Sequence, residues 1–519
     1  MIFYKKNLIP NIKLLKIKTN FLIFLTLISV IQIFISNFNT IDTLITLIIL
    51  FTTYWMMEKI FNKKYIVEFF IPFLIVFYLN WSYLSGPLIL KTFFFQNLTS
   101  NFFLPIETFI IAIIFQILLV LVLLFFESSI KLNKISTFIS NKIIYNLKGY
   151  VVLNRTFLYF LLLFLFINRL YLNVIDQGVN SFTEYGNISM KLLYGFNLFY
   201  FLPLIHFFYL FQVKEISKGK IYFIFFIYIL SGFFFAITGN SRTQIFLFFF
   251  YLLFFVNFFK IFIFENYSTT LNFKFFILII FILIIGNKLS QNITEDRIYR
   301  SDISAMELFK LSTGERLEGP EIEHFLGDES LVGNPIADRL ISIKFLDKSL
   351  YYSKDFNKSQ KKYFKDFINK RFLFILPQNL TNIFDKEYIK EDYAISSGSL
   401  VERTYYGYDK GGLKTSGNFL AELMIIFDSY IVICLLIFIM FLIVFIITQS
   451  FQKKNPSSNE FSPLIIVLLI GIVNVINADS LMGILSFTFR TFSETIFLNF
   501  IIILIYLNFF KKNENISNR

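Results

Sequence analysis

The sequence predicts an all-α fold: a polytopic integral membrane protein with about twelve transmembrane helices and one large, mostly helical external segment. Hydrophobic residues make up 56% of the 519 residues and charged residues only 16%, and the mean hydropathy is +0.66. A soluble domain of this length is far less apolar. The apolar residues come in continuous runs, whereas a membrane barrel would show short segments of alternating polarity. The runs therefore predict helices.

Each expected span is an apolar run that can cross roughly 30 Å of hydrocarbon as a helix. The runs cover residues 20–37, 40–57, 66–83, 105–126, 156–172, 192–211, 221–237, 244–259, 275–289, 419–447, 463–478 and 491–510. They divide the chain into a first bundle of about nine helices over 1–289, a long connection over 290–418, and about three C-terminal helices over 419–519.

Lysine and arginine residues are distributed unequally between the two sides of this arrangement. One side carries the basic N-terminus, which is expected to be retained, and the lysine clusters after the second, fourth, sixth, eighth and tenth spans. In its short loops and span ends, the other side carries only Lys91, Arg169, Lys191, Arg242 and Arg490. Positive charges near span ends stay on the cytoplasmic side. Both termini are therefore expected in the cytoplasm, and the 290–418 connection on the outer face.

Composition and motifs argue against several classes of function. The net charge of +13 is scattered among the connections between spans, which argues against a nucleic-acid-binding face. The one cysteine, Cys434, lies in an apolar run, so neither a disulfide framework nor a thiolate metal site is expected. Motifs for metal or nucleotide cofactors do not occur, and there are only two histidines. No cofactor and no metal are therefore expected.

The 290–418 connection contains turn signals such as "STGERLEGPE" and "SSGS" between two stretches with helical spacing, "PIADRLISIKFLDKSLYYSKDF" and "KSQKKYFKDFINKRF". It is expected to form a small, mostly helical external subdomain. A connection this long in a compact protein is more often functional than idle.

Arginines at the outer ends of spans are candidates for binding an anionic, lipid-linked substrate, because a guanidinium binds phosphate bidentately. Arg242 in "TGNSRTQ" is the strongest candidate, since the preceding small residues predict a tight turn that exposes backbone N–H groups at a helix start. The alternative is an interfacial arginine. Arg490 has Glu494 one helical turn later, which is often only a structural pair. Arg169 resembles a simple interfacial anchor.

The end of the long connection interleaves polar, aromatic and glycine residues. Stacking on sugar rings is expected of its tyrosines, and hydrogen bonding to hydroxyls or phosphate of its charged residues. These candidates are Tyr405, Tyr406, Tyr408, Glu402, Arg403, Asp409 and Lys414. An ordinary re-entry loop with interfacial tyrosines is the alternative.

Two residues are candidates for proton transfer. Glu422 in "SGNFLAELMIIF" falls in the first turns of the tenth expected span, where a carboxylate is costly unless it is paired. It could act as a general base, but an ion pair with an arginine such as Arg242 is favoured. His324 in "EIEHFLGDES" has three carboxylates nearby, so it is either a base or an ordinary surface histidine.

The stretch "SGSLVERTYYGYDKGGLKTSGNFLAELMIIFDSYIVICLLIF" and the turn before Arg242 resemble features of the O-antigen and capsule repeat-unit polymerases (Wzy-type proteins). The architectural resemblance covers nearly the whole chain: about twelve spans, cytoplasmic termini and one large external loop late in the chain. Relatives often carry a glycine after the aromatic residue at which this chain has "FDSY".

The resemblance implies a glycosyltransferase at the outer face of the bacterial inner membrane, with undecaprenyl-pyrophosphate-linked oligosaccharides as donor and acceptor. Arg242 would be the first pyrophosphate ligand, with Arg490, Arg403 and Lys414 secondary. Glu422, Asp409 and His324 compete for the role of the group that deprotonates the attacking hydroxyl. The lipid bilayer and a chain-length regulator are the other partners implied.

Two rival functions share part of this pattern. An O-antigen ligase has the same architecture and donor but transfers the glycan to a lipid A core, and the loop residue His324 fits such an enzyme. A lipid-linked oligosaccharide flippase would bury charges along several spans, whereas the charges here lie near span ends.

Overall fold

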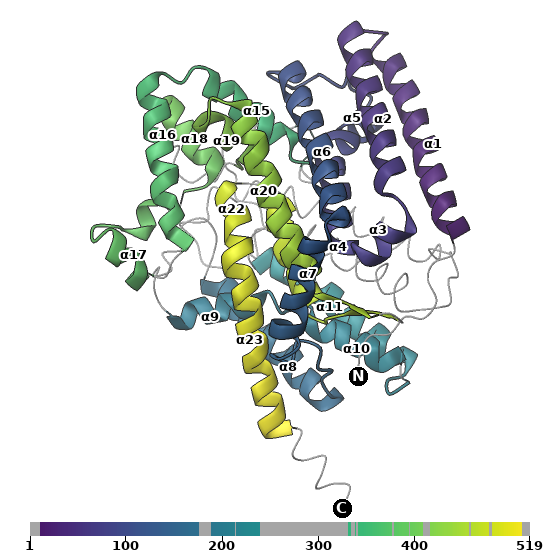
Figure 1. Cartoon of the computed structure of the whole chain (residues 1–519), viewed down its shortest axis with the longest axis vertical. Helices are drawn as coiled ribbons and strands as arrows, with labels where there is room; N and C mark the ends of the chain where they lie inside the picture. The colour runs from purple at the N-terminus through teal and green to yellow at the C-terminus, as the bar shows by residue number, and fades with distance from the viewer. Residues whose placement is uncertain are drawn as a thin grey trace, which may run out of the picture.

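The computed structural model describes most of the chain. The described residues are 11–175, 188–212, 214–238, 331–333, 338, 341–375, 378–393, 395–407, 416–455, 458–476 and 480–510. They are almost entirely helical, apart from a short β-hairpin (Figure 1). The all-α prediction is thus confirmed in outline.

The N-terminal helices form an antiparallel bundle. It consists of α1 (Asn11–Ile35), α2 (Thr40–Ile60), α3 (Lys63–Glu68), α4 (Phe70–Asn80), the π-helical turn η1 (Trp81–Ser85), α5 (Gly86–Phe93) and α6 (Pro105–Ser128). The α1–α2 turn is closed by Asn39, whose side chain accepts hydrogen bonds from the first N–H groups of α2. A proline at the first position of α6 favours a helix start there. Large apolar side chains remain exposed along α1, α2 and α6, as expected of faces that meet lipid.

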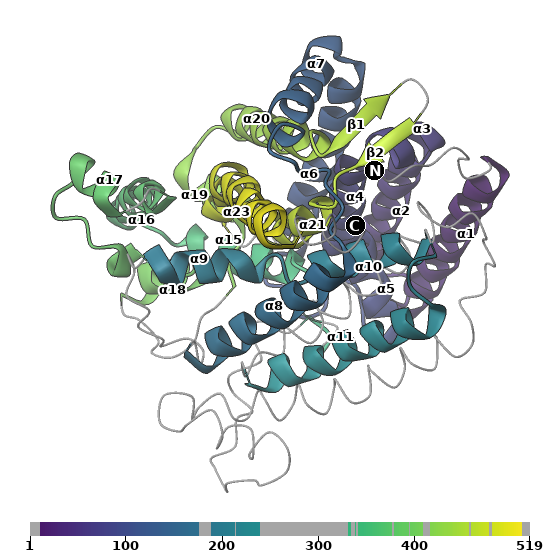
Figure 2. The same cartoon turned by 90° about the horizontal axis from the view of Figure 1, so that it is seen from below.

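A second group of helices follows the fourth span. It comprises α7 (Ile130–Ile139), η2 (Ser140–Ile144), α8 (Arg155–Ile175), α9 (Ile188–Asn197), α10 (Leu202–Gln212) and α11 (Lys218–Thr238). Figure 2 shows α8, α9, α10 and α11 together on one side of the molecule, with α7 projecting at the opposite edge. Aromatic side chains pack in this group, including Tyr200, in the turn between α9 and α10, against Tyr228 and Phe235 of α11.

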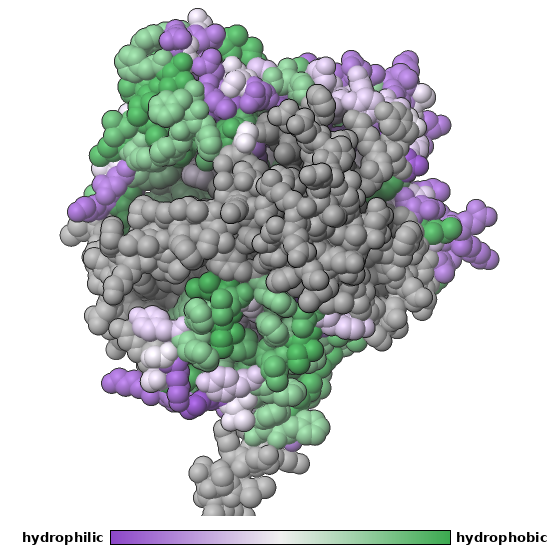
Figure 3. Space-filling model, turned by 180° about the vertical axis from the view of Figure 1, so that it is seen from behind, coloured by the Kyte–Doolittle hydropathy of each residue, from purple (hydrophilic) through white to green (hydrophobic). Residues whose placement is uncertain are grey.

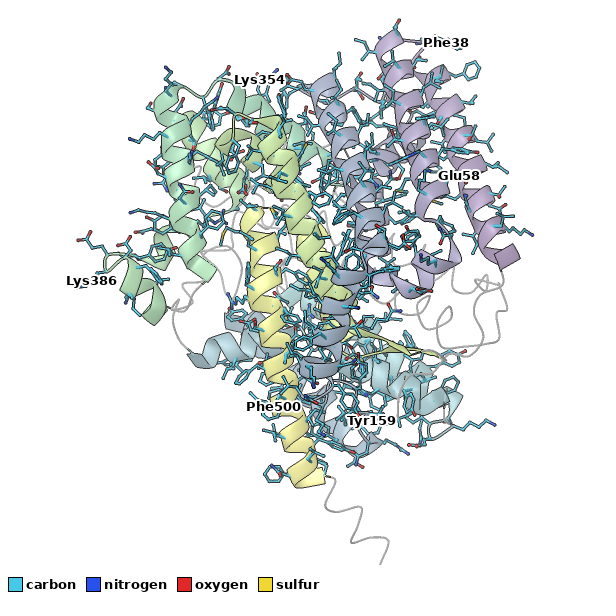
Figure 4. All side chains as sticks on the ribbon, viewed as in Figure 1. Phe38, Glu58, Tyr159, Lys354, Lys386 and Phe500 are labelled. Atoms are coloured by element: carbon cyan, nitrogen blue, oxygen red, sulfur yellow. The ribbon has the colours of Figure 1, made fainter. Side chains whose placement is uncertain are left out.

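The described part of the long connection contains α15 (Ile343–Lys354), α16 (Lys358–Arg371), η6 (Phe372–Ile375), α17 (Gln378–Phe384), η7 (Lys390–Tyr393) and α18 (Ser397–Tyr406). Each of the two stretches predicted to be helical contains a helix among its described residues, α15 in the first and α16 in the second. Figure 4 places Lys354, at the end of α15, at the same end of the molecule as Phe38 in the α1–α2 turn. The sequence predicts the same side of the membrane for both.

The C-terminal part contains α19 (Phe419–Ile426), α20 (Tyr430–Gln449), the antiparallel strands β1 (Gln452–Asn455) and β2 (Ser458–Phe461), α21 (Ile465–Ile476), α22 (Leu481–Ser486), η8 (Phe487–Thr491), α23 (Phe492–Ile505) and η9 (Tyr506–Phe510). The single span predicted over 419–447 is wrong. Phe427 and Ser429 have extended backbones, so the run is split into α19 and α20.

Eight helices among the described residues are long and apolar enough to cross a membrane. They are Leu15–Ile35, Thr40–Ile60, Phe70–Phe93, Pro105–Ser128, Arg155–Leu172, Leu192–Phe211, Tyr430–Gln449 and Leu481–Phe510. The chain is therefore that of a polytopic membrane protein. Figure 3 shows broad apolar areas on the described surface. The predicted spans 244–259 and 275–289 lie outside the described residues, so the total of twelve stays a prediction.

The helix α15 is held against the N-terminal bundle by a buried carboxylate. Asp347 is fully buried and accepts hydrogen bonds from the backbone N–H groups of Phe103 and Leu104, at 2.9 and 2.8 Å, and from the Thr108 hydroxyl at 3.1 Å. The ammonium of Lys344 lies 3.2 Å away and also faces the ring of Phe103. These bonds use the N–H groups that precede α6, which no helical carbonyl can satisfy.

A buried lysine connects the N-terminal bundle to the 290–418 connection at a second point, Leu331. Lys91, with 0% exposure, donates from its Nζ to Gln96 Oε1, Ser100 O, Ser100 Oγ and Leu331 O at 2.6–3.1 Å. Asp338 in turn accepts from the N–H groups of Leu331 and Val332. Buried polar groups of this kind are tolerated because they are hydrogen-bonded.

We expect Asp347→Asn to weaken the docking of α15 strongly. The amide cannot neutralise buried Lys344, and its NH₂ group faces N–H donors; breaking one partner of a buried pair costs about 3–5 kcal/mol. The measurement is the thermal unfolding of the purified protein in detergent. Asp366→Asn, on the exposed face of α16, is the control and should change the unfolding free energy by no more than about 0.5 kcal/mol. Equal stability of the two variants would contradict this role of Asp347.

Candidate functional site

The structure describes about half of the residues predicted to form the site. Arg242, His324, Tyr408, Asp409 and Lys414 lie outside the described residues, and their roles stay predictions. Among the others, Glu422 lies at the centre of a buried polar cluster, which makes it the starting point for the candidate site.

Glu422 is held inside the protein by the short helix α19. The side chain of Asn418 caps this helix by accepting from the Leu420 N–H at 3.0 Å, and its amide group donates to the hydroxyl of Tyr83 at 2.7 Å. This second bond connects the start of α19 to the N-terminal bundle. The carboxylate of Glu422 is one turn further on and has an exposed fraction of 0%.

Three separate segments converge on the Glu422 carboxylate. The Ser397 hydroxyl, in the first turn of α18, donates to Oε1 at 2.5 Å. The backbone N–H of Leu481, at the start of α22, donates to Oε2 at 2.6 Å. The guanidinium of Arg371, in the last turn of α16, lies 3.9 Å from Oε1. Burial raises the pKa of Glu422, and Arg371 and the two hydrogen bonds oppose this shift.

Arg371 is the cationic member of the cluster, and the sequence analysis did not single it out. Its side chain is 13% exposed, and within the described part of the chain Nη1 has no hydrogen-bond partner. Burial lowers the pKa of Arg371, while the charge of Glu422 raises it; a guanidinium stays charged under such shifts. Glu422 was expected to pair with an arginine such as Arg242; among the described residues, that arginine is Arg371.

A tyrosine pair flanks the arginine. Tyr388 stacks on Tyr393 with ring centroids 4.8 Å apart and an interplanar angle of 3°. Burial is the largest cause that raises the pKa of Tyr388, whereas the charge of Arg371 lowers it. The phenol therefore stays protonated at neutral pH, so it is a hydrogen-bond donor rather than an anion beside the arginine.

Close backbone packing keeps Ser397 in place. Gly417 lies so near the start of α18 that an added Cβ would be 2.2 Å from the Ser397 Cβ and 2.6 Å from the Gly398 nitrogen. Only glycine fits there without displacing α18. The small residues of "SSGS" and "TSGN" thus allow the two segments to approach each other.

Three other predicted residues of the 396–430 stretch that the structure describes have structural partners. Glu402, expected to bind hydroxyls, is instead buried and paired with Lys348 at 2.7 Å. Tyr405 and Tyr406 are half-buried and pack on Tyr352, with ring centroids 4.9 and 5.7 Å away. This aromatic cluster leaves them less accessible than an open sugar platform would require.

The two remaining arginines lie apart from the Glu422 cluster. Arg403 is half-buried in the last turn of α18. Arg490, in η8, is paired with Glu494 at 2.7 Å. The predicted pairing of Arg490 with Glu494, one helical turn later, is therefore confirmed. Both side chains of the pair are partly exposed.

Comparison with protein-family models, curated proteins and solved structures finds no match to this chain. Among the described residues, no three His, Cys, Asp or Glu side chains are grouped as metal ligands would be.

We expect Gly417→Ala to disrupt the cluster, because the new methyl group overlaps Ser397 and the backbone of Gly398. Overpacking of this kind costs about 1–3 kcal/mol or more. The measurement is thermal stability, together with proteolytic accessibility of α18 (Ser397–Tyr406). Gly219→Ala, where nothing lies within 4 Å of the added Cβ, is the matched control. If both variants unfold at the wild-type temperature, the close approach is not required.

The raised pKa of Glu422 predicts how stability depends on pH. In the window between the ordinary value of 4.5 and the higher folded value, the folded protein binds more protons than the unfolded chain. Stability should therefore fall as pH rises through this window. Glu422→Gln removes the titrating group and should flatten the fall, measured as unfolding temperature against pH. The control is Glu494→Gln, at a partly exposed carboxylate, which should keep the wild-type dependence of unfolding temperature on pH. If Glu422→Gln also kept the wild-type dependence, the prediction would be contradicted.

Proposed function

We propose that the chain is a polysaccharide polymerase that joins undecaprenyl-pyrophosphate-linked oligosaccharide repeat units at the outer face of the bacterial inner membrane, with both termini in the cytoplasm. The observation that supports this most is the environment of Arg371. Its guanidinium is largely buried and lies beside the buried carboxylate of Glu422. Among the described residues, its Nη1 has no hydrogen-bond partner. Arg371 lies in the segment that the charge distribution predicts to be outside. A site of this kind suits an anionic leaving group.

The proposed reaction is a glycosyl transfer without a metal. A hydroxyl oxygen of the acceptor repeat attacks C1 of the donor sugar, and the bond between C1 and the pyrophosphate oxygen breaks. Undecaprenyl pyrophosphate leaves with the electron pair, and the hydroxyl proton passes to a base. Negative charge grows on the departing pyrophosphate, so preorganised cationic donors in a water-poor site lower the barrier.

In this proposal Arg371 contacts the pyrophosphate and Glu422 is a positioning residue. Both Glu422 oxygens already accept hydrogen bonds, from Ser397 and from the Leu481 N–H. A carboxylate so engaged is poorly placed to take a proton from a sugar hydroxyl, which requires direct hydrogen-bond reach. The base is then one of the two other predicted candidates, Asp409 or His324.

The other predicted arginines differ in how well they suit binding of the pyrophosphate. Arg242, which the sequence predicts as the first pyrophosphate ligand, keeps that predicted role beside Arg371. Arg490 is a weaker candidate than the sequence implies, because its Nε already donates a hydrogen bond to the carboxylate of Glu494. Two cationic groups on one pyrophosphate would match its charge, and arginine suits such bidentate contacts better than lysine.

We expect Arg371→Ala to abolish polymer formation, because removing one preorganised cationic donor from an anionic leaving group costs about 10²–10³ in rate. Arg371→Lys should restore only part of the activity, since a single ammonium lacks the fork geometry. The measurement is the gel profile of surface glycan from cells that carry each variant. Lys370→Ala, the exposed neighbour whose ammonium lies 3.8 Å from Asp385, is the matched control.

The product pattern separates the proposal from its rivals. Core capped with a single repeat indicates a lost polymerase. Complete absence of capped core, with long lipid-linked polymer on the outer leaflet, indicates an O-antigen ligase, and absence without such polymer indicates a flippase. Wild-type polymer in the Arg371→Ala cells would overturn the role of Arg371.

A further inference from the structure

A groove runs along one face of α7 and η2, far in sequence from the Glu422 cluster. It has a volume of about 530 Å³ and is lined by Ile130, Asn133, Lys134, Thr137, Phe138, Asn141 and Lys142. The lining positions recur every three or four residues, so they share one helix face. Its volume falls within the usual range for small-ligand sites, roughly 300–1,000 Å³.

The groove face combines positive charge with exposed apolar surface. Lys134 and Lys142 are exposed, and neither forms an ion pair within the described part of the chain. Between them Phe138 is 61% exposed, and Ile130 at the start of the groove is 72% exposed. From residue 128 to residue 175 the sequence contains no Asp or Glu. The groove therefore offers cations and hydrocarbon contact together, and its own stretch of sequence supplies no acid to neutralise the two lysines.

The helix that forms the groove is attached to the protein at both ends. Asn133, at the N-terminal end of the groove, donates from Nδ2 to the carbonyls of Phe126, Glu127 and Ser129 at 3.0–3.3 Å, which fixes α7 to the end of α6. At the far end, Ser140 and Tyr150 share a hydrogen bond of 2.9 Å. The groove therefore lies on a helix that is hydrogen-bonded to the rest of the protein at both of its ends.

The groove begins close to the end of a helix that can span the membrane. This helix is α6, one of the eight apolar helices long enough to cross the bilayer; it ends at Ser128, two residues before Ile130. The charge distribution predicts the cytoplasmic side for this end of the span. Anionic phospholipids give a cytoplasmic leaflet surface its negative potential, which attracts lysines close to it.

We propose that the α7–η2 groove binds the headgroup of an acidic phospholipid of the surrounding bilayer. Lys134 and Lys142 contact the lipid phosphate, and Phe138 and Ile130 contact the glycerol and the start of the acyl chains. Charge complementarity selects an anion, and the exposed apolar side chains beside a span end select one that carries hydrocarbon. The site is independent of the proposed glycosyl transfer.

The test uses the full-length protein in a neutral detergent, titrated with dioleoylphosphatidylglycerol or dioleoylphosphatidylcholine and followed by native mass spectrometry. The wild type should bind the first phosphatidylglycerol more tightly than phosphatidylcholine. Lys134→Gln combined with Lys142→Gln should weaken phosphatidylglycerol binding by about 30-fold, from about 1 kcal/mol per lysine, and leave phosphatidylcholine binding unchanged. Lys214→Gln combined with Lys220→Gln, two exposed lysines away from the groove, is the matched control.

Two further measurements identify the kind of ligand. Phe138→Ala should weaken phosphatidylglycerol binding although it removes no charge, which a site for a free anion would not show. If inorganic phosphate displaced bound phosphatidylglycerol as strongly as added phosphatidylglycerol does, the proposal would be overturned in favour of a site for a free anion. Stronger displacement by polyglutamate would overturn it in favour of an acidic protein partner, and equal phosphatidylglycerol binding by both double-lysine variants would remove the groove altogether.

Discussion

The structure depends most on the satisfaction of buried polar groups where α15 meets the N-terminal bundle. Asp347 and Lys91 together bond backbone groups of the segment before α6 and of the 331–338 region. Without them these N–H and carbonyl groups would be buried and unpaired. Because α15 packs against α18 and α19, the same contacts also position the two helices that carry Ser397 and Glu422.

The Glu422 cluster shows how one buried charge can define a site. A carboxylate in an apolar interior is costly unless it is paired and hydrogen-bonded. Here the partners come from three separate helices, so satisfying Glu422 also fixes the relative positions of α16, α18 and α22. Arg371 is left with hydrogen-bonding capacity at one nitrogen, which is the property that a ligand for an anion needs.

Sequence reasoning predicted the helical class and five of the eight apolar spans to within about five residues, because continuous hydrophobic runs are a strong signal. It also predicted that Glu422 is paired. It missed the break after Ile426, since "FDSY" contains no proline or glycine, and it missed Arg371, which lies in a strongly charged helix. A partner 51 positions away along the chain is set by tertiary packing, and no local pattern encodes it.

The break between α19 and α20 has a mechanical consequence. With eight residues, α19 is about 12 Å long, less than half the thickness of the hydrocarbon layer, about 30 Å. It is therefore not stretched between the two membrane interfaces as α20 is. When the bilayer thins or thickens, the tilt of α20 can change at the extended residues 427–429. Because the helix is interrupted there, a change in the tilt of α20 is not transmitted along one continuous helix to the turn that carries Glu422.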